Sequence, residues 1–205
     1  TVSAEVNCNW KLIVENLIDF YHLNVIHRGT NGRSFTTESF VFNARPDGRY
    51  QAFYNAGPST TTQQPVFGKA PWMADRPNDF STAGLLPPNF TFFARVDSVH
   101  PYVTWPLAPD KSMVIVYTLL PEVYFGEPNF AERAEDYRTY QTRLLGEDTA
   151  MLASLVTTLS PRTRLAVAAD LTLPTETVAM RTIAEWRGID ASVYQRRPAI
   201  FLVQA

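Results

Sequence analysis

The chain has 205 residues, 45% of them hydrophobic, and a formal net charge of −2, which is the composition of a globular protein large enough to bury one substantial core. This charge gives no reason to expect nucleic acid or an anionic membrane surface as a partner, and no apolar run approaches the roughly 18–20 residues that span a bilayer. From its length we expect one domain. The single cysteine, Cys8, excludes an intrachain disulfide and favours no particular compartment, and no signal-peptide pattern opens the chain, so the expected cytoplasmic location is consistent with the sequence.

The residue pattern in the first quarter of the chain predicts a short lead-in, then one helix, then a pair of strands. Residues 1–8 form a short lead-in that is typical of a strand. Over residues 9–27 apolar positions interleave with polar ones, which predicts a largely buried helix, and a following stretch with two glycines ends it. A hairpin is then expected, with strands over 34–44 and 49–56 joined by a turn at 45–48.

Residues 57–88 hold six prolines, and we expect a long irregular loop that either covers one side of a pocket or is a surface insertion without function. Three short adjacent strands follow, which predicts an antiparallel sheet. The longest helical pattern comes next, then a less regular stretch and a final helix stopped by Gly188. The expected ranges are 91–97, 100–105 and 112–120 for the strands, 129–157 for the long helix, 161–171 for the irregular stretch and 174–186 for the last helix. Helices before and after a run of strands favour an α+β fold.

Two of the three histidines, His22 and His27, lie in the first predicted helix together with Glu15 and Asp19. An unpaired polar group in a buried helix is costly, and metal ligation is the usual partner of such a cluster. Positions i and i+5 lie about 140° apart on a regular helix, so we expect the helix to end, or to contain a π-type turn, between the two histidines. Asp19, three residues before His22, falls on the same face and can hold the outer nitrogen of that ring.

A third ligand is expected on the long helix 129–157. Glu147 lies on a mixed edge of this helix, whereas the neighbours of Asp148 three and four positions away are all leucine or methionine. An ionised carboxylate on such an apolar stripe requires a partner charge or a metal. Two histidines and one aspartate form the facial triad that leaves coordination positions open on non-haem Fe(II). Alternatively, Asp148 is a buried salt-bridge partner of Arg143 or Arg162.

These residues resemble the motif of one enzyme family. The run Asn9-Trp10-Lys11, Glu15-Asn16, Asp19, Tyr21-His22 and His27, followed far downstream by Glu147-Asp148, is similar to the catalytic domain of the large (alpha) subunit of Rieske-type non-haem iron ring-hydroxylating oxygenases. The resemblance covers nearly the whole chain, so we expect residues 1–205 to form such a catalytic domain. It implies a helix-grip (START/Bet v 1-like) fold, in which an antiparallel sheet wraps on the long helix.

The resemblance also implies a role for each matching residue. His22, His27 and Asp148 would be the ligands of Fe(2+). Asp19 would be the carboxylate that connects a metal histidine to the electron-delivering cluster of a neighbouring subunit. Asn16 would lie near the iron without being a firm ligand.

The electron source is expected outside this sequence. A Rieske [2Fe-2S] cluster needs two cysteines and two histidines, and the chain has one cysteine and one histidine beyond the motif pair. We therefore expect the cluster in an N-terminal Rieske domain that precedes this chain. The resemblance further implies NAD(P)H as electron donor through a reductase or ferredoxin, and a homotrimer with or without small beta subunits.

The implied reaction belongs to aromatic hydrocarbon catabolism. O2 would be used to hydroxylate a small aromatic or similarly apolar substrate, by mono- or dioxygenation, or to remove an O- or N-alkyl group. The aromatic content of 13% suits such a pocket, although aromatic cores are commoner. We expect the pocket to be lined by residues next to the ligands and by aromatic residues of the sheet: Asn16, Leu17, Leu23, Leu144, Met151, Phe90, Phe92 and Tyr102.

Two other function classes fit the same residues. A metal-free module that binds a hydrophobic ligand can be built on a START-like fold, because a fold does not fix a function. A zinc hydrolase is the second alternative, since two histidines and a carboxylate also suit zinc. His100 and Cys8 have no partners at ligand spacing, and we expect both to be structural.

Overall fold

The computed structural model describes residues 1–20, 22–27, 29–31, 35–158, 162, 164–169, 177–186 and 199–204. The chain divides into two compact units, Thr1–Met151 and Leu152–Ala205, and each is described by itself. The prediction that residues 1–205 together form one catalytic domain stays a prediction. Among the helices of the described ranges, none has the length and apolarity required to cross a bilayer.

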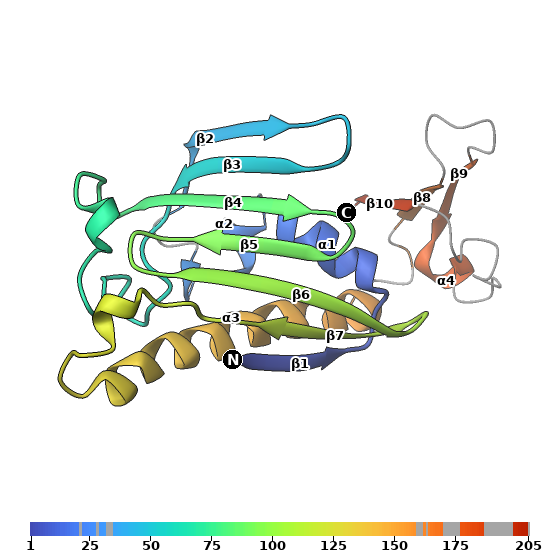
Figure 1. Ribbon diagram of the computed structural model, residues 1–205. Coiled ribbons are helices and arrows are strands. Elements are labelled where there is room, and N and C mark those ends of the chain that lie inside the picture. The colour runs from blue at the N-terminus through green and yellow to red at the C-terminus, as the bar shows by residue number, and fades with distance from the viewer. Residues whose placement is uncertain are drawn as a thin grey trace. The chain divides into compact units, whose positions relative to one another are not determined.

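The first unit is built on a seven-stranded antiparallel sheet with the strand order β1-β7-β6-β5-β4-β3-β2 (Figure 1). Helices α1 and α3 lie on one face of this sheet, and a buried hydrogen bond from the Tyr102 hydroxyl of β6 to Gln141 Oε1 of α3, 2.6 Å long, joins the layers. The strands are β1 Val2–Val6, β2 Thr36–Ala44, β3 Tyr50–Asn55, β4 Phe80–Leu86, β5 Phe90–Ala94, β6 Val99–Ala108 and β7 Lys111–Val116. This arrangement confirms the α+β, helix-grip prediction.

Alternation along the strands creates the face that receives the helices. In β7, Ser112, Val114 and Val116 are buried while the residues between them are half-exposed, as expected for a sheet covered on one side. Phe20, from the end of α1, packs against the same face: its ring centroid lies 5.1 Å from that of Tyr54 in β3. The core therefore lies between the sheet and the segment that carries the two histidines.

The predicted helix 9–27 is two helices, which corrects its expected course. Helix α1 (Trp10–Ile18) begins at Asn9, whose side chain accepts a hydrogen bond from the Lys11 amide, and it ends at Asp19, which has extended backbone angles. A short helix α2 (Leu23–Ile26) follows. The interruption at Asp19, which precedes both histidines, was not predicted. Helix α2 then ends at Ile26, so the predicted end of the helix between His22 and His27 is confirmed.

The long loop predicted at 57–88 contains strand β4 and a short 3-10 helix, η2 (Pro71–Met73). β4 pairs with β3 on one side and β5 on the other. Its small residues and flanking prolines hide the strand pattern in the sequence. Gly84 in β4 is required by packing, because a Cβ there would overlap the Phe92 ring. A second 3-10 helix, η3 (Glu122–Tyr124), precedes helix α3 (Phe130–Thr158), which matches the predicted long helix within one residue at each end.

The second unit holds a three-stranded antiparallel sheet with the order β10-β8-β9. Its elements are β8 (Arg164–Ala169), β9 (Thr177–Thr182), α4 (Ile183–Trp186) and β10 (Ala199–Gln204). The prediction of a helix over 174–186 is therefore wrong for 177–182, which form β9, and right for 183–186, while 174–176 lie outside the described residues. The stretch 161–171, expected to be irregular, contains strand β8. Pairing between β8 and β9 over six residues each overrides the local helical preference. Gly188, the expected helix stop, lies outside the described residues.

Candidate metal centre

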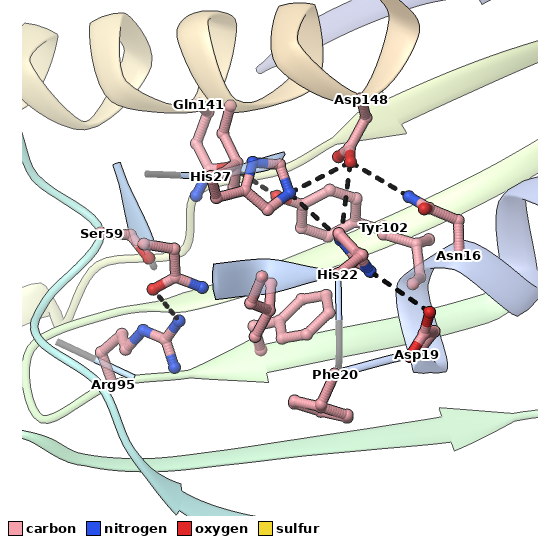
Figure 2. A pocket seen from close by; sticks show the side chains of 15 residues that line it. Asn16, Asp19, Phe20, His22, His27, Ser59, Arg95, Tyr102, Gln141 and Asp148 are labelled. Atoms are coloured by element: carbon pink, nitrogen blue, oxygen red, sulfur yellow. Dashed lines mark hydrogen bonds and ion pairs between the residues drawn. The ribbon is translucent and has the colours of Figure 1, made fainter. Parts of the chain in front are cut away.

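The structure brings His22, His27 and Asp148 together at one point. His22 Nε2 lies 3.2 Å from His27 Nε2, and Asp148 Oδ1 lies 3.7 Å from the first nitrogen and 3.1 Å from the second. Figure 2 shows the two imidazole rings meeting beneath the Asp148 carboxylate of α3. His27 is 1% exposed and Asp148 is 8% exposed, so the cluster is shielded from bulk water.

These distances fit a single metal ion. An ion held at about 2.1 Å by three ligands on one octahedral face places the ligand atoms about 3 Å apart. The separations of 3.2, 3.7 and 3.1 Å between the three candidate ligand atoms are close to this octahedral spacing. The donor set of two imidazoles and one carboxylate is the set that non-haem Fe(II) uses.

Two short helices and one long one position the ligands. His22 is the residue before α2, and His27 is the residue after it, with backbone angles outside the helical region. Both rings can therefore face the same point, which one regular helix would not permit. Asp148 comes from α3, and Asn16 of α1 donates to its Oδ1 from 3.1 Å, which holds the carboxylate toward the histidines.

Burial and neighbouring carboxylates move the pKa values of the two rings in opposite directions. Burial lowers the pKa of His22 more than the nearby Asp148 raises it. For His27 burial also lowers the pKa, but hydrogen bonds to Asp148 and Glu147 outweigh it and the net pKa is raised. A proton on this pair of rings is therefore favoured at His27 over His22. Binding of a cation would release that proton, as ligand imidazoles require.

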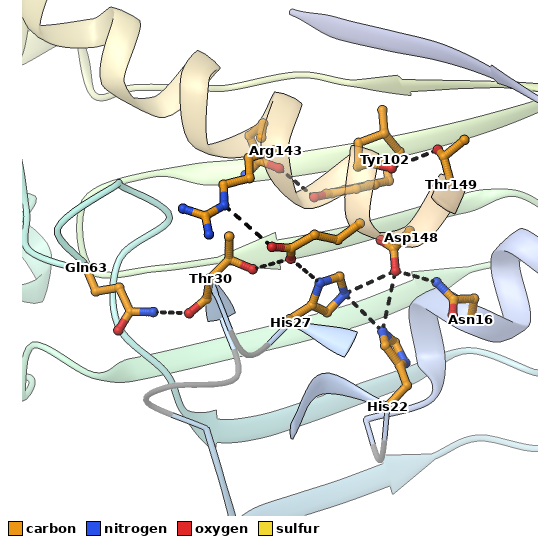
Figure 3. A network of polar contacts seen from close by, with 12 residues as sticks. Asn16, His22, His27, Thr30, Gln63, Tyr102, Arg143, Asp148 and Thr149 are labelled. Atoms are coloured by element: carbon orange, nitrogen blue, oxygen red, sulfur yellow. Dashed lines mark hydrogen bonds and ion pairs between the residues drawn. The ribbon is translucent and has the colours of Figure 1, made fainter. Parts of the chain in front are cut away.

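Glu147 is a residue of this centre that the sequence reasoning placed on a mixed helix edge. Its Oε2 lies 2.9 Å from His27 Nδ1 and accepts a hydrogen bond of 2.7 Å from the Thr30 hydroxyl. Figure 3 shows the His27 ring between Thr30 on one side and Asp148 on the other. The Arg143 Nε lies 3.5 Å from its other oxygen. Because consecutive helix residues point about 100° apart, Asp148 reaches the inner nitrogen of His27 and Glu147 the outer one. The adjacent pair of acids was the signal available in the sequence.

Asp19 lies beside His22, as predicted, but the two residues do not share the face of one helix. Its Oδ2 is 3.9 Å from His22 Nδ1, which is beyond hydrogen-bond distance, and its side chain is 49% exposed. The chain leaves the helix at Asp19, so the predicted geometry was wrong while the predicted proximity holds. A half-exposed carboxylate next to a ligand ring can be reached from outside the first unit.

A small cavity, partly open to solvent, adjoins the three candidate ligands (Figure 2). Five of the residues expected in a pocket line it: Asn16, Leu17, Leu23, Tyr102 and Leu144. Phe93, Arg95, Gln141, Asn31 and Ser59 also line it and were not predicted. Ser59 belongs to the stretch 57–88, which therefore contributes to the cavity wall.

Phe90 and Phe92 do not line the cavity that the described residues form, which corrects their assignment. Successive strand residues point to opposite faces of a sheet. Phe93 and Tyr102 share the helix-side face, with ring centroids 5.2 Å apart, so Phe90 and Phe92 project from the other face. The backbone of Met151 is helical, but its side chain lies outside the described part of the structure.

His100 and Cys8 take no part in the centre. His100 is fully buried, with its Nε2 2.9 Å from the Ser98 hydroxyl, and burial lowers its pKa to about 3. Burial raises the pKa of the Cys8 thiol to about 11, which leaves little of the reactive thiolate at neutral pH.

Comparisons with known proteins identify one matching family and several similar solved structures. The family model described as "Ring hydroxylating alpha subunit (catalytic domain)" matches residues 1–178. Among solved structures, the chain is similar to the quaternary ammonium Rieske monooxygenase CntA, at 14% identity and a TM-score of 0.55 over 75% of this chain and 37% of that chain. It is also similar to dicamba monooxygenase bound to dicamba, at 18% identity and a TM-score of 0.53 over 75% of this chain and 47% of that chain.

The chain thus spans less than half the length of these two solved structures, and at such identities the likeness concerns the fold. No curated protein matches the sequence.

Proposed function

Since the chain belongs to the family of ring-hydroxylating alpha subunits, as their catalytic domain, we propose that it binds Fe(II) through His22, His27 and Asp148 and oxygenates a small organic substrate. The observation that carries this proposal is the convergence of the three ligand atoms, within 4.8 Å of one another, beside a cavity. When bound, the iron would supply the activation of O2.

The protein's own residues prepare the site for that chemistry. Glu147 and Thr30 fix the orientation of the His27 ring, and Asn16 fixes the Asp148 carboxylate. Leu17, Leu23 and the other apolar residues of the cavity exclude water from the part of the substrate that lies near the ligands. A substrate held there reacts in a fixed orientation.

We further propose that electrons reach the site through Asp19 from a Rieske [2Fe-2S] cluster outside this sequence. The half-exposed position of Asp19 next to His22 supports this role. A cluster carried by a neighbouring subunit would require an assembly such as a homotrimer, with or without beta subunits, and a reductase or ferredoxin that draws on NAD(P)H. We also propose that the enzyme is cytoplasmic.

The test is metal analysis and oxygen uptake on the full-length enzyme, loaded anaerobically with Fe(II) or Zn(II). The proposal predicts one mononuclear iron per chain in addition to the two irons of the [2Fe-2S] cluster, substrate-dependent oxygen uptake with Fe(II), and none with Zn(II). Asp148→Ala should lose the mononuclear iron while its circular dichroism spectrum is unchanged. Hydrolytic activity with zinc, or protein that takes up no mononuclear iron when Fe(II) is supplied, would contradict the proposal and favour the zinc hydrolase or the metal-free binding module, respectively.

A further inference from the structure

An arginine side chain is buried in the wall of the cavity that adjoins the three ligands. Arg95 follows strand β5 and is 4% exposed. In Figure 2, Arg95 and Ser59 lie at one end of the cavity, while Asp148 and Asn16 lie at the other. A charged group buried in this position is unusual, because charged side chains are seldom buried without a partner of opposite charge.

The partners of Arg95 within the protein are neutral. Its Nη1 donates to the Tyr54 hydroxyl over 2.6 Å, and its Nη2 donates to Asn31 Oδ1 over a longer 3.3 Å. Burial raises the pKa of Tyr54, so this phenol stays uncharged. A guanidinium has five N–H donors, and its Nε–H has no acceptor among the described residues. The side chain therefore retains both its charge and unused donors.

No carboxylate in the described part of the chain forms an ion pair with Arg95. The nearest acid in the sequence, Asp97, is fully buried, and its two oxygens accept hydrogen bonds from Tyr137, over 2.6 Å, and from Ser98, over 2.8 Å. The acid therefore already has its own hydrogen-bond donors. Within the described residues, Asp97 therefore attracts Arg95 only at longer range and forms no ion pair with it.

The remaining lining of the cavity includes both polar and apolar side chains. Asn31 and Ser59 add polar groups to Arg95, whereas Leu17, Leu23 and Phe93 form apolar wall. A ligand that matches this lining has an apolar body and one anionic end. Arginine recognises a planar carboxylate through paired N–H···O bonds, which a neutral group of the same shape does not reproduce in strength.

We propose that the substrate is a small aromatic or similarly apolar carboxylic acid whose carboxylate is bound by Arg95. This inference rests on the proposed function, because it takes the cavity to be the substrate site. It narrows the substrate class from apolar compounds in general to organic anions. It also assigns Arg95 as a specificity-determining residue of the site.

The test compares benzoate with benzamide, its neutral analogue of the same shape, as ligands of the full-length protein. Dissociation constants are measured by calorimetry with and without bound Fe(II), since the metal itself can bind a carboxylate. The inference predicts that benzoate binds at least about tenfold more tightly than benzamide in both states. Equal affinities, or no binding of either compound at millimolar concentration, would overturn it.

Two variants separate Arg95 from other sources of the preference. Arg95→Gln should abolish the preference for benzoate, and Arg95→Lys should retain part of it, because the charge remains while the paired geometry is lost. Arg45→Gln, at an exposed turn position, is the matched control and should leave the preference unchanged. A preference that survives in folded Arg95→Gln would overturn the inference. If Arg95→Gln does not fold, the wild-type comparison and Arg95→Lys still decide.

Iron content measured on the same preparations keeps the two proposals apart. One mononuclear iron per chain, beyond the two cluster irons, with no preference for benzoate would refute the carboxylate inference and leave the oxygenase proposal intact. A clear preference for benzoate in protein that never binds the mononuclear iron would refute the oxygenase proposal, and the inference would fall with it as a statement about a substrate.

Discussion

Replacement of Glu147 should weaken metal binding without unfolding the protein. The carboxylate faces His27 Nδ1 at 2.9 Å and accepts from Thr30 at 2.7 Å, so Glu147→Ala removes two charge-assisted hydrogen bonds. Loss of such an outer partner of a ligand histidine typically reduces metal affinity about 10- to 100-fold. Because the side chain is 22% exposed, water can take its place in the variant, and the loss of folding free energy should remain about 1 kcal/mol.

The assay is anaerobic competition for Fe(II) between the full-length protein and a chromogenic chelator. Glu147→Ala should lose about 100-fold in affinity, and Glu147→Gln about tenfold, since the amide oxygen still accepts one hydrogen bond but carries no charge. Glu135→Gln is the control, because Glu135 is an exposed acid of the same helix whose partner is Arg138. Affinity of Glu147→Ala within about twofold of the wild type would refute the positioning role.

Asp19→Asn should bind iron nearly as well as the wild type. Its turnover driven by NAD(P)H and the reductase should fall by orders of magnitude, whereas turnover driven by hydrogen peroxide should persist. Equal losses in both assays would contradict the electron-transfer role. Because burial lowers the pKa of His100 to about 3, the unfolded chain binds a proton near pH 6.5 that the folded chain refuses, so stability falls as the pH drops from 6.5 toward 3, by up to about 1.4 kcal/mol per pH unit. In urea unfolding, His100→Gln should show a smaller loss between pH 7 and pH 4.5 than the wild type, and an identical loss would refute this origin. Gly84→Ala should destabilise the fold by about 1–3 kcal/mol through overlap with Phe92, and adding Phe92→Leu should recover part of it; a thermally unchanged single variant would be inconsistent with the packing described.

The parts of the site that the sequence predicted are those where polar side chains interrupt an apolar pattern. Asp148 was recognised because its helical neighbours are apolar, and Leu145, one of them, is buried. His22 and His27 were recognised by their position in a buried segment. In each case the free energy of burying a polar group is large enough to leave a pattern in a single sequence.

The parts that could not be predicted depend on contacts between distant segments. Nothing local in residues 9–27 requires extended backbone at Asp19, and the packing of Phe20 against Tyr54 of β3 accompanies the change of direction. The choice between Phe92 and Phe93 is a matter of strand parity, which a run of aromatic residues does not disclose. Arg95 has the sequence context of a surface arginine, and its burial follows from the assembled sheet.

The most direct test of the central claim is anomalous diffraction at the iron absorption edge from crystals of the full-length protein grown anaerobically with Fe(II). The structure predicts one strong peak in this domain, at bonding distance from the Nε2 atoms of His22 and His27 and from an Asp148 oxygen. Crystals of Asp148→Ala should lack that peak. An iron-loaded protein with no peak between these three residues, or with its peak at another group of ligands, would contradict the assignment of the metal centre.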